Sequence, residues 1–393
     1  MAPNPFVPTF GADPYIIVGR DPILDAFAEP FREGRPGAPG LTVLITGERG
    51  MGKTVMLNEY ESAAQEQGWL TISESGSPGL LERLVRDHLP RLLAQHDPLG
   101  PTKLKTTGGG VQPVTLTVAW EDRHPAESTL RSQVAALTDI LAKHLTGLVI
   151  TVDEVQGADP TELRKLGEVV QFARRERRLL GFAAAGLSSF LDRFLAQPGT
   201  TFLRRAERHT LADVRLVDAR HALEATITDA GRRIDADALD HAAAATRGYP
   251  FMIQLVGYEA WRRAPNRVEI TLPDVRAAIG QARSALGERV HAPALAPLSP
   301  VERAYLSAMA ADGDTPSRTS DIAKRLGVGA DYQQQYRARL LRSGIIEPAG
   351  RGLVRYTIPA LGDYLLRTSP TDAEEERLAE LARAQARRRS DLD

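Results

Sequence analysis

The sequence predicts an α/β fold, in which a helix-flanked parallel sheet is followed by an all-helical segment and a C-terminal winged helix-turn-helix. Three observations support this prediction. Up to residue 212, apolar runs of strand length alternate with segments of helical periodicity, as in parallel sheets covered by helices. Strand signals then fade over residues 213–291. After residue 298, three short helical patterns precede a Gly-rich hairpin, which is the winged-helix order.

Composition narrows the class of protein. A chain of 393 residues suggests two or three domains. Its 49 Lys and Arg nearly balance its 50 Asp and Glu, so the whole chain shows no general affinity for polyanions. The absence of cysteine excludes disulfides, thiolate catalysis and Cys-ligated metal sites. No signal-peptide pattern and no apolar run of membrane-spanning length is evident, so we expect a cytoplasmic protein with no membrane contact. The composition, rich in Ala, Arg and Leu, is typical of a high-GC bacterial genome.

The elements of the α/β part are expected in order along residues 15–212, after a Pro-rich N-terminal arm at 1–14. Buried strands are expected at 41–46, 69–73, 148–152 and 179–185. Helices are expected from the region of 21 to 31 and at 80–93, 130–144 and 160–178. Alternation behind a run of three glycines predicts a β-hairpin inserted at about 104–120.

A Gly-rich motif follows the first buried strand and precedes a helical pattern. It matches G-x-x-x-x-G-K-[ST] at every fixed position, in the strand–loop–helix context of a phosphate-binding loop. Backbone N–H groups of such a loop surround phosphate oxygens at the positive end of the following helix. We therefore predict binding of ATP with Mg²⁺, in which Lys53 contacts the β- and γ-phosphates and the Thr54 hydroxyl ligates the metal. The binding residues are Gly47, Glu48, Arg49, Gly50, Met51, Gly52, Lys53, Thr54 and Val55.

Two carboxylates follow a second buried strand. Residues 148–152 read as a buried strand, and Asp153 and Glu154 follow directly after it. Carboxylates at the C-terminal tip of a buried parallel strand indicate a site. We expect Asp153 to hold Mg²⁺ and Glu154 to polarise the attacking water. The adjacent pair favours an ATP hydrolase over a small-molecule kinase, which would leave both the pair and the C-terminal region unexplained.

The C-terminal half is expected to contain three parts. Residues 213–291 read as three or four helices forming a lid, with Asp235 and Asp274 as expected caps. A linker spans 292–298, and a winged helix-turn-helix spans 299–369, where Ser299 caps the first helix. Residues 370–393 form a charged tail.

The predicted winged helix is basic, with eight Lys or Arg against four Asp or Glu over residues 319–369. Duplex DNA is the partner that this charge favours, and a protein-contact role is the alternative. The side chains expected to meet DNA lie on the third helix and the hairpin. They are Gln333, Gln334, Arg337, Arg339, Arg351 and Arg355.

By its order of motifs, the chain resembles the AAA+ class over residues of roughly 15 to 365, specifically the branch of archaeal and eukaryotic origin-recognition initiator ATPases and their bacterial relatives. The resemblance implies that a motif before the first helix lies beside the adenine; here that motif is Val18, Gly19 and Arg20.

The resemblance implies three further sites. A polar sensor follows the fourth core strand, which makes Ser188 the candidate and Ser189 the alternative. An arginine finger precedes the last core strand, and Arg204 and Arg205 occupy that place. Such a finger acts across a subunit boundary and so implies self-association through the core. In the lid motif 246–250, Arg247 and Pro250 would face the nucleotide, although Phe251 replaces the Arg that usually follows.

Two functions follow from these features. The first is a DNA-associated switch ATPase, acting in replication, transposition, defence or transcription control. The second is a signalling NTPase of the STAND kind, in which the winged helix is an autoinhibitory domain that contacts protein.

Overall fold

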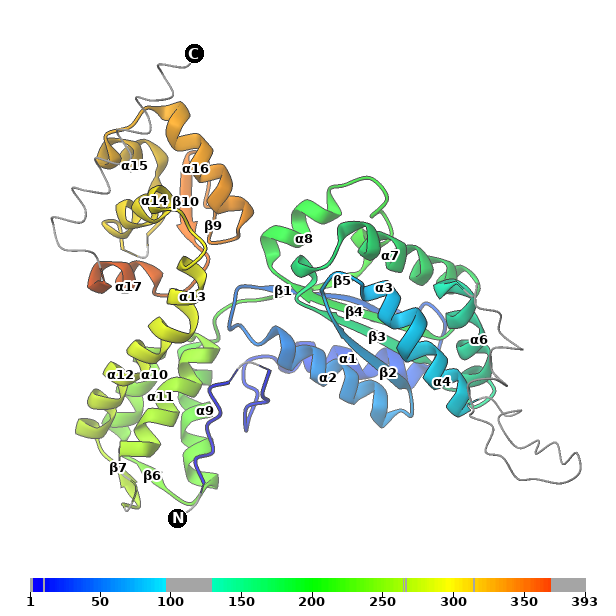
Figure 1. Cartoon of the computed structure of the whole chain (residues 1–393). Helices are drawn as coiled ribbons and strands as arrows, with labels where there is room; N and C mark the ends of the chain where they lie inside the picture. Colours follow the sequence, from blue (N-terminus) through cyan, green and yellow to red (C-terminus); the bar gives the residue numbers. More distant parts are fainter. Residues whose placement is uncertain are drawn as a thin grey trace, which may run out of the picture. The chain divides into compact units, whose positions relative to one another are not determined.

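The computed structural model (Figure 1) describes residues 3–313 except 10, 97–128, 264 and 266, and residues 315–368. The chain divides into two compact units. The sheet unit comprises Arg20–Gly47 and Lys53–Leu211, and the helical unit comprises Met1–Gly19, Glu48–Gly52 and Ala212–Asp393. The hairpin expected at about 104–120 and the tail 370–393 lie outside the described residues. Over the described ranges, no helix has both the length and the apolar character needed to cross a membrane.

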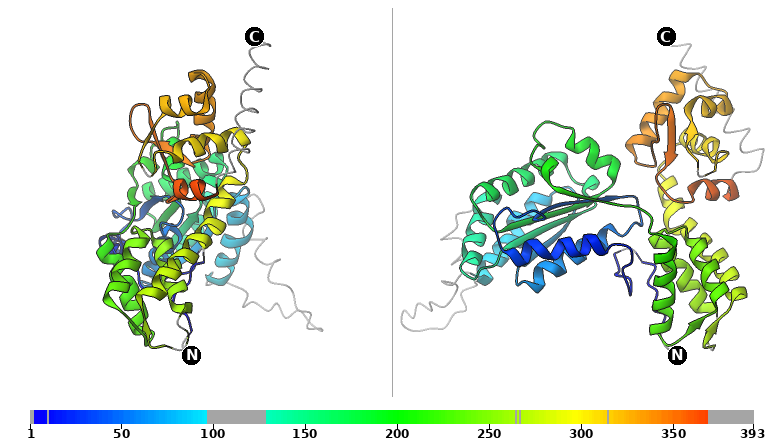
Figure 2. Two further views of the ribbon diagram at one scale, coloured as in Figure 1. Left: turned by 90° about the vertical axis from the view of Figure 1, so that its left-hand side faces the viewer. Right: turned by 180° about the vertical axis from the view of Figure 1, so that it is seen from behind.

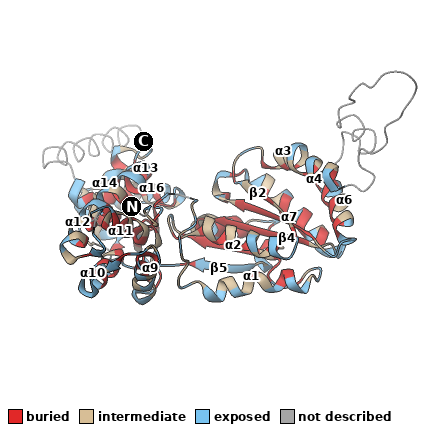
Figure 3. Ribbon diagram, turned by 90° about the horizontal axis from the view of Figure 1, so that it is seen from below, coloured by how far each residue is buried: buried red, intermediate tan, exposed pale blue. Residues whose placement is uncertain are grey.

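The sheet unit is built on five parallel strands in the order β2-β3-β4-β1-β5. Strands β1, β3 and β4 are buried almost throughout, as the red strands of Figure 3 show. Their apolar sequences follow from burial on both faces, and the α/β prediction is confirmed. The strands are β1 Thr42–Gly47, β2 Leu70–Ser75, β3 Leu148–Asp153, β4 Leu180–Gly186 and β5 Glu207–Leu211.

Helices cover both faces of this sheet. Helices α1 (Asp21–Glu33) and α2 (Lys53–Glu66) lie on one face, in blue in the rear view of Figure 2. The opposite face packs against α6 (Leu130–Ala142), α7 (Pro160–Arg175) and the stretch from Leu80 to His96. That stretch, expected as one helix, is α3 (Leu80–Arg83), the π-helix η1 (Leu84–His88) and α4 (Leu89–His96).

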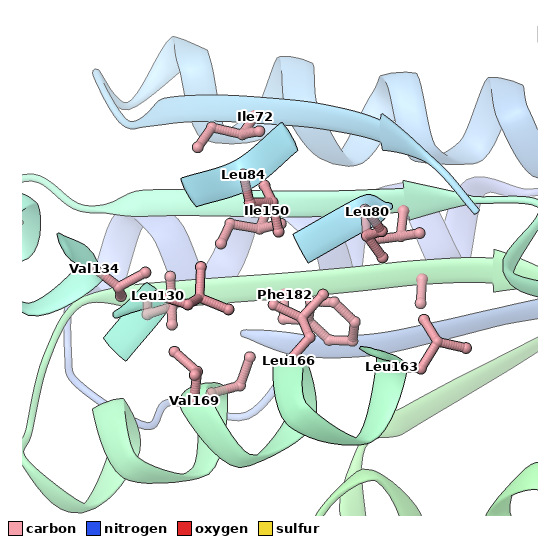
Figure 4. Close-up of a cluster of buried hydrophobic side chains, with 14 of the residues drawn as sticks. Ile72, Leu80, Leu84, Leu130, Val134, Ile150, Leu163, Leu166, Val169 and Phe182 are labelled. Atoms are coloured by element: carbon pink, nitrogen blue, oxygen red, sulfur yellow. The ribbon is translucent and has the colours of Figure 1, made fainter. Parts of the chain in front are cut away.

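Two side-chain clusters fix these layers. In Figure 4, Leu163, Leu166 and Val169 of α7 point toward the strand residues Ile150 and Phe182. On the other face, Phe31 makes edge contacts with Tyr60 and Trp69, with ring centroids 5.0 and 5.2 Å apart. Each such aromatic pair contributes roughly 0.5–1.5 kcal/mol beyond its buried area. Trp69 is therefore a packing residue.

The helical unit begins with four helices and a two-stranded sheet of β6 (Arg233–Ile234) and β7 (Glu269–Ile270). The helices are α9 Leu216–Asp229, α10 Ala236–Thr246, α11 Pro250–Arg263 and α12 Leu272–Leu286. Asp235 precedes α10 as expected. Asp274 caps α12 from a different position: Thr271 is the N-cap, and Asp274, three residues on, completes a capping box by accepting from the Thr271 backbone N–H.

The N-terminal arm packs on α11. A Cβ atom on Gly257 would lie 2.3 Å from the Phe6 ring, so this glycine makes room for the aromatic side chain. Asn4 Nδ2 donates to the Tyr258 carbonyl at 3.1 Å, and Gln254 Oε1 accepts from the Val7 N–H at 3.1 Å. Residues 3–8 are thus held by side-chain burial and hydrogen bonds.

The last part of the helical unit consists of short helices and a three-stranded sheet, and its assignment as a winged helix-turn-helix stays a prediction. Where a linker was expected, α12 continues through the π-helix η4 (Gly287–His291) into α13 (Ala292–Leu295). A capping box of Ser299 and Glu302 then starts α14. Three antiparallel strands follow in the order β8-β10-β9. The elements are α14 Pro300–Ala310, β8 Ser317–Arg318, α15 Thr319–Leu326, α16 Ala330–Arg342, β9 Ile346–Pro348, β10 Leu353–Tyr356 and α17 Leu361–Thr368.

Candidate functional site

The Gly-rich motif lies between the end of β1 and the start of α2, as its context predicts. Gly50 and Gly52 have φ of 75° and 88°, in the left-handed region that glycine enters without steric cost. A Cβ on Gly52 would meet nothing within 4 Å, so backbone conformation rather than crowding requires glycine there. Lys53 begins α2 and is buried.

Thr54 and Asp153, the two predicted metal ligands, lie in direct contact. Thr54 Oγ1 donates to Asp153 Oδ2 at 2.6 Å, and Asp153 Oδ1 accepts from the Glu154 N–H at 2.8 Å. Both residues belong to the sheet unit. A threonine hydroxyl and a carboxylate are oxygen donors of the type that Mg²⁺ prefers. The donor set therefore fits the predicted ion.

Hydrogen bonds fix α2 against the sheet beneath this pair. Glu61 of α2 accepts from Thr151 of β3, and from Ser73 of β2 at 2.6 Å. Thr46 and Thr210 share a 2.9 Å hydrogen bond between β1 and β5. The helix that carries Thr54 and the strand that carries Asp153 are thus held by polar contacts as well as by packing.

Glu154 lies on a sharp turn after β3, with φ 51° and ψ 44°. Its side chain is exposed and accepts a hydrogen bond from Gln156 Nε2. Gln156 Oε1 in turn accepts from the Leu187 N–H at 3.2 Å. Sequence reasoning missed Gln156. The one signal available was an amide side chain two residues after the carboxylate pair.

The predicted sensor and finger residues lie where the chain order places them. Ser188 is the first residue of α8 (Ser188–Leu195), directly after Leu187, and both it and Ser189 are half-buried. Arg204 and Arg205 are exposed on a single turn, η3 (Leu203–Arg205), before β5. The structure leaves their roles as predictions.

The predicted lid motif connects α10 to α11 within the helical unit. Arg247 ends α10 with φ 52°, and Pro250 begins α11. Gly248 has φ 79°, and a Cβ there would lie 2.0 Å from the Val214 carbonyl oxygen. This position therefore requires glycine. Arg247 forms an ion pair with Asp363 of α17 at 3.3 Å.

Tyr249, in the middle of that motif, is a second residue that sequence reasoning missed. Its hydroxyl donates to the carbonyl oxygen of Arg49 at 3.0 Å, and both residues belong to the helical unit. Burial raises the pKa of Tyr249, so the hydroxyl stays a hydrogen-bond donor. A Cβ on Gly50 would lie 2.2 Å from this hydroxyl.

The motif expected beside the adenine lies just before α1. Gly19 has φ 66°, and a Cβ there would lie 3.0 Å from Asp218 Oδ2 of α9. Asp218 pairs with Arg215 at 2.8 Å, and the Arg215 hydrogen bond lowers the pKa of Asp218. Val18 is half-buried, and Arg20 precedes the first turn of α1.

One predicted DNA contact is wrong. Gln333 of α16 is only 6% exposed and donates from Nε2 to the Tyr305 hydroxyl at 3.1 Å. It faces the interior because α16 packs on α14, so its side chain cannot meet a base edge in this conformation.

The other predicted contacts differ in exposure. Gln334 and Arg339 of α16 and Arg351 of the β9–β10 turn are exposed. Arg337 is half-buried, and its Nε has no hydrogen-bond partner among the described residues. Arg355 is exposed and forms an ion pair with Glu347 of the neighbouring strand.

The fold and the motif geometry define a class of protein. Residues 16–182 match the family described as AAA ATPase domain, and residues 288–365 match a domain of unknown function, DUF8462. The structure has an ORC-like AAA+ P-loop fold, so the fold that the resemblance implied is confirmed. No curated protein sequence matches the chain.

Solved structures from two archaea share this fold. The ORC2 protein of Aeropyrum pernix in ADPNP-ADP complexes has a TM-score of 0.62 at 14% identity, covering 96% of this chain and 98% of that chain. The Walker-type ATPase PABY2304 of Pyrococcus abyssi has a TM-score of 0.62 at 16% identity, covering 89% and 96%. The ADP form of the Aeropyrum protein has a TM-score of 0.51 at 15% identity, covering 96% and 97%.

Proposed function

We propose that the protein binds and hydrolyses ATP with Mg²⁺ and uses the nucleotide state to switch its association with DNA. The observation that carries the ATPase part is the 2.6 Å contact between Thr54 Oγ1 and Asp153 Oδ2, with Glu154 next in the chain. It brings the end of the phosphate-binding loop and the end of a buried strand together. The Aeropyrum ORC2 protein, which shares the fold, was solved in ADPNP-ADP complexes.

Each residue of this site has a proposed task. Lys53 balances the charge of the β- and γ-phosphates, while Thr54 and Asp153 hold Mg²⁺. The ion, when bound, would neutralise charge on the phosphate oxygens. Glu154 orients the attacking water and accepts its proton.

Other residues complete the nucleotide site in this proposal. Val18, Gly19 and Arg20 border the adenine, and Arg247 and Pro250 report the nucleotide through the lid. Ser188 contacts the γ-phosphate or the water. Arg204 or Arg205 reaches the site of a neighbouring subunit and stabilises transition-state charge. The exposure of both arginines supports a role between subunits.

The DNA part of the proposal rests on the surface of the C-terminal elements. Gln334 and Arg339 lie exposed on α16, the helix that reads the major groove in winged helix-turn-helix proteins, and Arg351 lies exposed on the hairpin. The two arginines could pair with phosphate oxygens, and the glutamine could form hydrogen bonds with a base edge. Arg337 and Arg355 supply further positive charge nearby.

A specific contact favours the second candidate function, the STAND-like signalling NTPase. Arg247 of the proposed nucleotide-sensing lid pairs with Asp363 of α17 at 3.3 Å. In addition, the buried His291 side chain bonds to the Pro359 carbonyl oxygen at 2.9 Å. These contacts would suit a C-terminal domain that restrains the lid until a protein partner displaces it.

DNA affinity measured with and without ATP across a salt series distinguishes the two. For DNA binding, log K falls linearly with log salt, with a slope of about 0.9 for each phosphate contact, and ATP shifts the affinity. Affinity that is absent, or independent of salt, contradicts the DNA proposal.

The autoinhibition candidate makes its own prediction in the full chain. Asp363→Ala should then raise basal ATP turnover, because Arg247 is released. Asp321→Ala is the matched control, since Asp321 also forms an exposed ion pair, with Lys324 on α15. Unchanged turnover in both variants would count against restraint of the lid by this contact.

A further inference from the structure

Gln156 joins two strand ends of the sheet unit through both ends of its amide. Its Nε2 donates to Glu154 Oε2, just after β3, and its Oε1 accepts from the Leu187 N–H at 3.2 Å, just after β4. Leu187 directly precedes Ser188, the first residue of α8. One side chain therefore connects the proposed water-activating carboxylate with the segment that carries the proposed sensor.

The direction of the amide is fixed by chemistry. Leu187 offers a backbone N–H, which can only donate, so the amide oxygen of Gln156 must face it. The NH₂ group must then face Glu154, whose ionised carboxylate can only accept. Reversing the amide would place a donor against a donor and an acceptor against an acceptor. The two hydrogen bonds therefore form together.

Three glycines hold the backbone around this amide in close contact. A Cβ on Gly186 would lie 2.5 Å from Val155 Cγ2 and 3.0 Å from Gln156 Oε1. A Cβ on Gly76, after β2, would lie 2.4 Å from the Glu154 carbonyl oxygen, and one on Gly157 would lie 2.2 Å from the Gly76 carbonyl oxygen. No side chain larger than hydrogen fits at these positions without a shift.

This close packing holds Glu154 in an uncommon backbone conformation. Its φ of 51° lies in the left-handed region, which is unfavourable for a non-glycine residue and persists where the surroundings enforce it. The Gly76 N–H also donates to the Asp153 carbonyl at 2.6 Å. The turn is thus clamped from the β2 side by Gly76 and from the β4 side by Gln156.

We propose that Gln156 is a positioning residue that fixes the direction of the Glu154 carboxylate and couples it to the main chain at Leu187. A displacement of the Leu187–Ser188 segment then moves the carboxylate with it. The proposal rests on the proposed role of Glu154 in activating water. In that role, Glu154 depends on Gln156 for the orientation of its carboxylate.

The first test replaces Gln156 in the full-length protein. Gln156→Leu removes both hydrogen bonds at similar size, and kcat should fall about 10- to 100-fold because a misplaced catalytic group costs rate. ATP affinity should stay unchanged, since Gln156 is not one of the proposed ATP-binding residues. Gln197→Leu is the matched control, because Gln197 also bonds one side chain, Arg164, at 3.2 Å; it should leave kcat unchanged.

The second test separates positioning from packing by keeping the length of the side chain. In Gln156→Glu, the introduced carboxylate cannot donate to Glu154 and repels it, so kcat should fall at least as far as in Gln156→Leu. ATP affinity should stay unchanged in both variants, a split between rate and affinity that a general loss of packing would not produce.

A third readout needs no nucleotide. The Leu187 amide should exchange its hydrogen faster in Gln156→Leu than in wild type, and it should keep its protection in Gln197→Leu. Wild-type kcat together with unchanged Leu187 protection in a folded Gln156→Leu protein would overturn the proposal. So would wild-type kcat in a folded Gln156→Glu protein, a test that stands even if the Leu variant fails to fold. Turnover that survives Glu154→Gln would instead overturn the role of Glu154, while the exchange result would still report the Gln156 link.

Discussion

At the scale of single residues, chemistry that depends on motif spacing was predictable. The Gly-rich motif and the carboxylate pair fix the positions of Lys53, Thr54 and Asp153 because strand ends and helix starts follow directly from local sequence. The contacts of Gln156 with Leu187 and of Tyr249 with Arg49 were not predictable, because they join residues 31 and 200 positions apart in the chain. Gln333 was assigned to the wrong face because α16 carries three consecutive glutamines, and only packing shows which one is buried.

Lys53→Ala should abolish ATP binding, since it removes the charge that faces the β- and γ-phosphates. Lys53 is buried, so thermal unfolding must confirm that the variant is folded. Calorimetric titration with ATP measures the effect. Wild-type affinity in a folded variant would mean that the loop does not hold the phosphates as proposed.

His291 should make the helical unit less stable in acid. Burial, and to a lesser extent the charge of Arg367, lower the pKa of His291, outweighing the opposing effect of its bond to the Pro359 carbonyl. As pH falls below the ordinary value of 6.5, the unfolded chain takes up a proton that the folded chain resists, so folding stability is full above that pH and declines below it.

Urea midpoints measured above and below that pH test this effect. His291→Phe should show a smaller loss of stability on acidification than wild type, whereas His241→Phe, at an exposed position on α10, should behave as wild type does. An unchanged pH dependence in the first variant would show that another group is responsible.

At the scale of helices and strands, the sequence predicted the type of each element better than its exact helical form or its ends. Apolar runs identified β1, β3 and β4, because parallel strands buried on both faces carry a continuous signal. The π-helix η1 was not predictable, since its residues have the same apolar spacing as an α-helix. The expected linker at 292–298 is largely helical because proline is tolerated in a first helical turn, and its presence alone did not mark a break.

Helix α16 offers a matched pair of neighbouring glutamines. Gln334→Ala should change DNA sequence preference with little effect on stability or on the salt slope, because Gln334 is exposed and uncharged. Gln333→Ala should instead cost about 1–3 kcal/mol of folding stability, since it leaves the buried Tyr305 hydroxyl without this partner. Binding-site selection and urea unfolding measure the two effects. The reverse pattern would mean that the face of α16 has been misassigned.

At the scale of the whole molecule, the order of parts was predictable and their contacts were not. The order of sheet strands, the helices after residue 212 and the C-terminal strands follows the chain, so composition and periodicity reveal it. The contact between Arg247, after α10, and Asp363 of α17 joins residues 116 positions apart. No local pattern encodes such a contact.

Self-association through the core predicts complementation between two inactive proteins. Lys53→Ala lacks a working phosphate-binding loop, and the double variant Arg204→Ala/Arg205→Ala lacks the proposed finger. Mixed together, some interfaces pair an intact loop with an intact finger, so ATP turnover should recover in part. Absence of recovery, in a protein that sediments as a monomer with ATP, would remove the subunit-spanning finger.

The central claim is that Glu154 activates water for ATP hydrolysis, whereas binding of ATP by the phosphate-binding loop does not require Glu154. ATP binding and single-turnover hydrolysis, measured on wild-type protein and on Glu154→Gln, test this claim most directly. The account predicts unchanged ATP affinity and a rate lower by about 10²–10⁴-fold, the usual contribution of a general base, because an amide cannot accept the proton. A rate close to that of wild type, or no hydrolysis by wild-type protein, would contradict it.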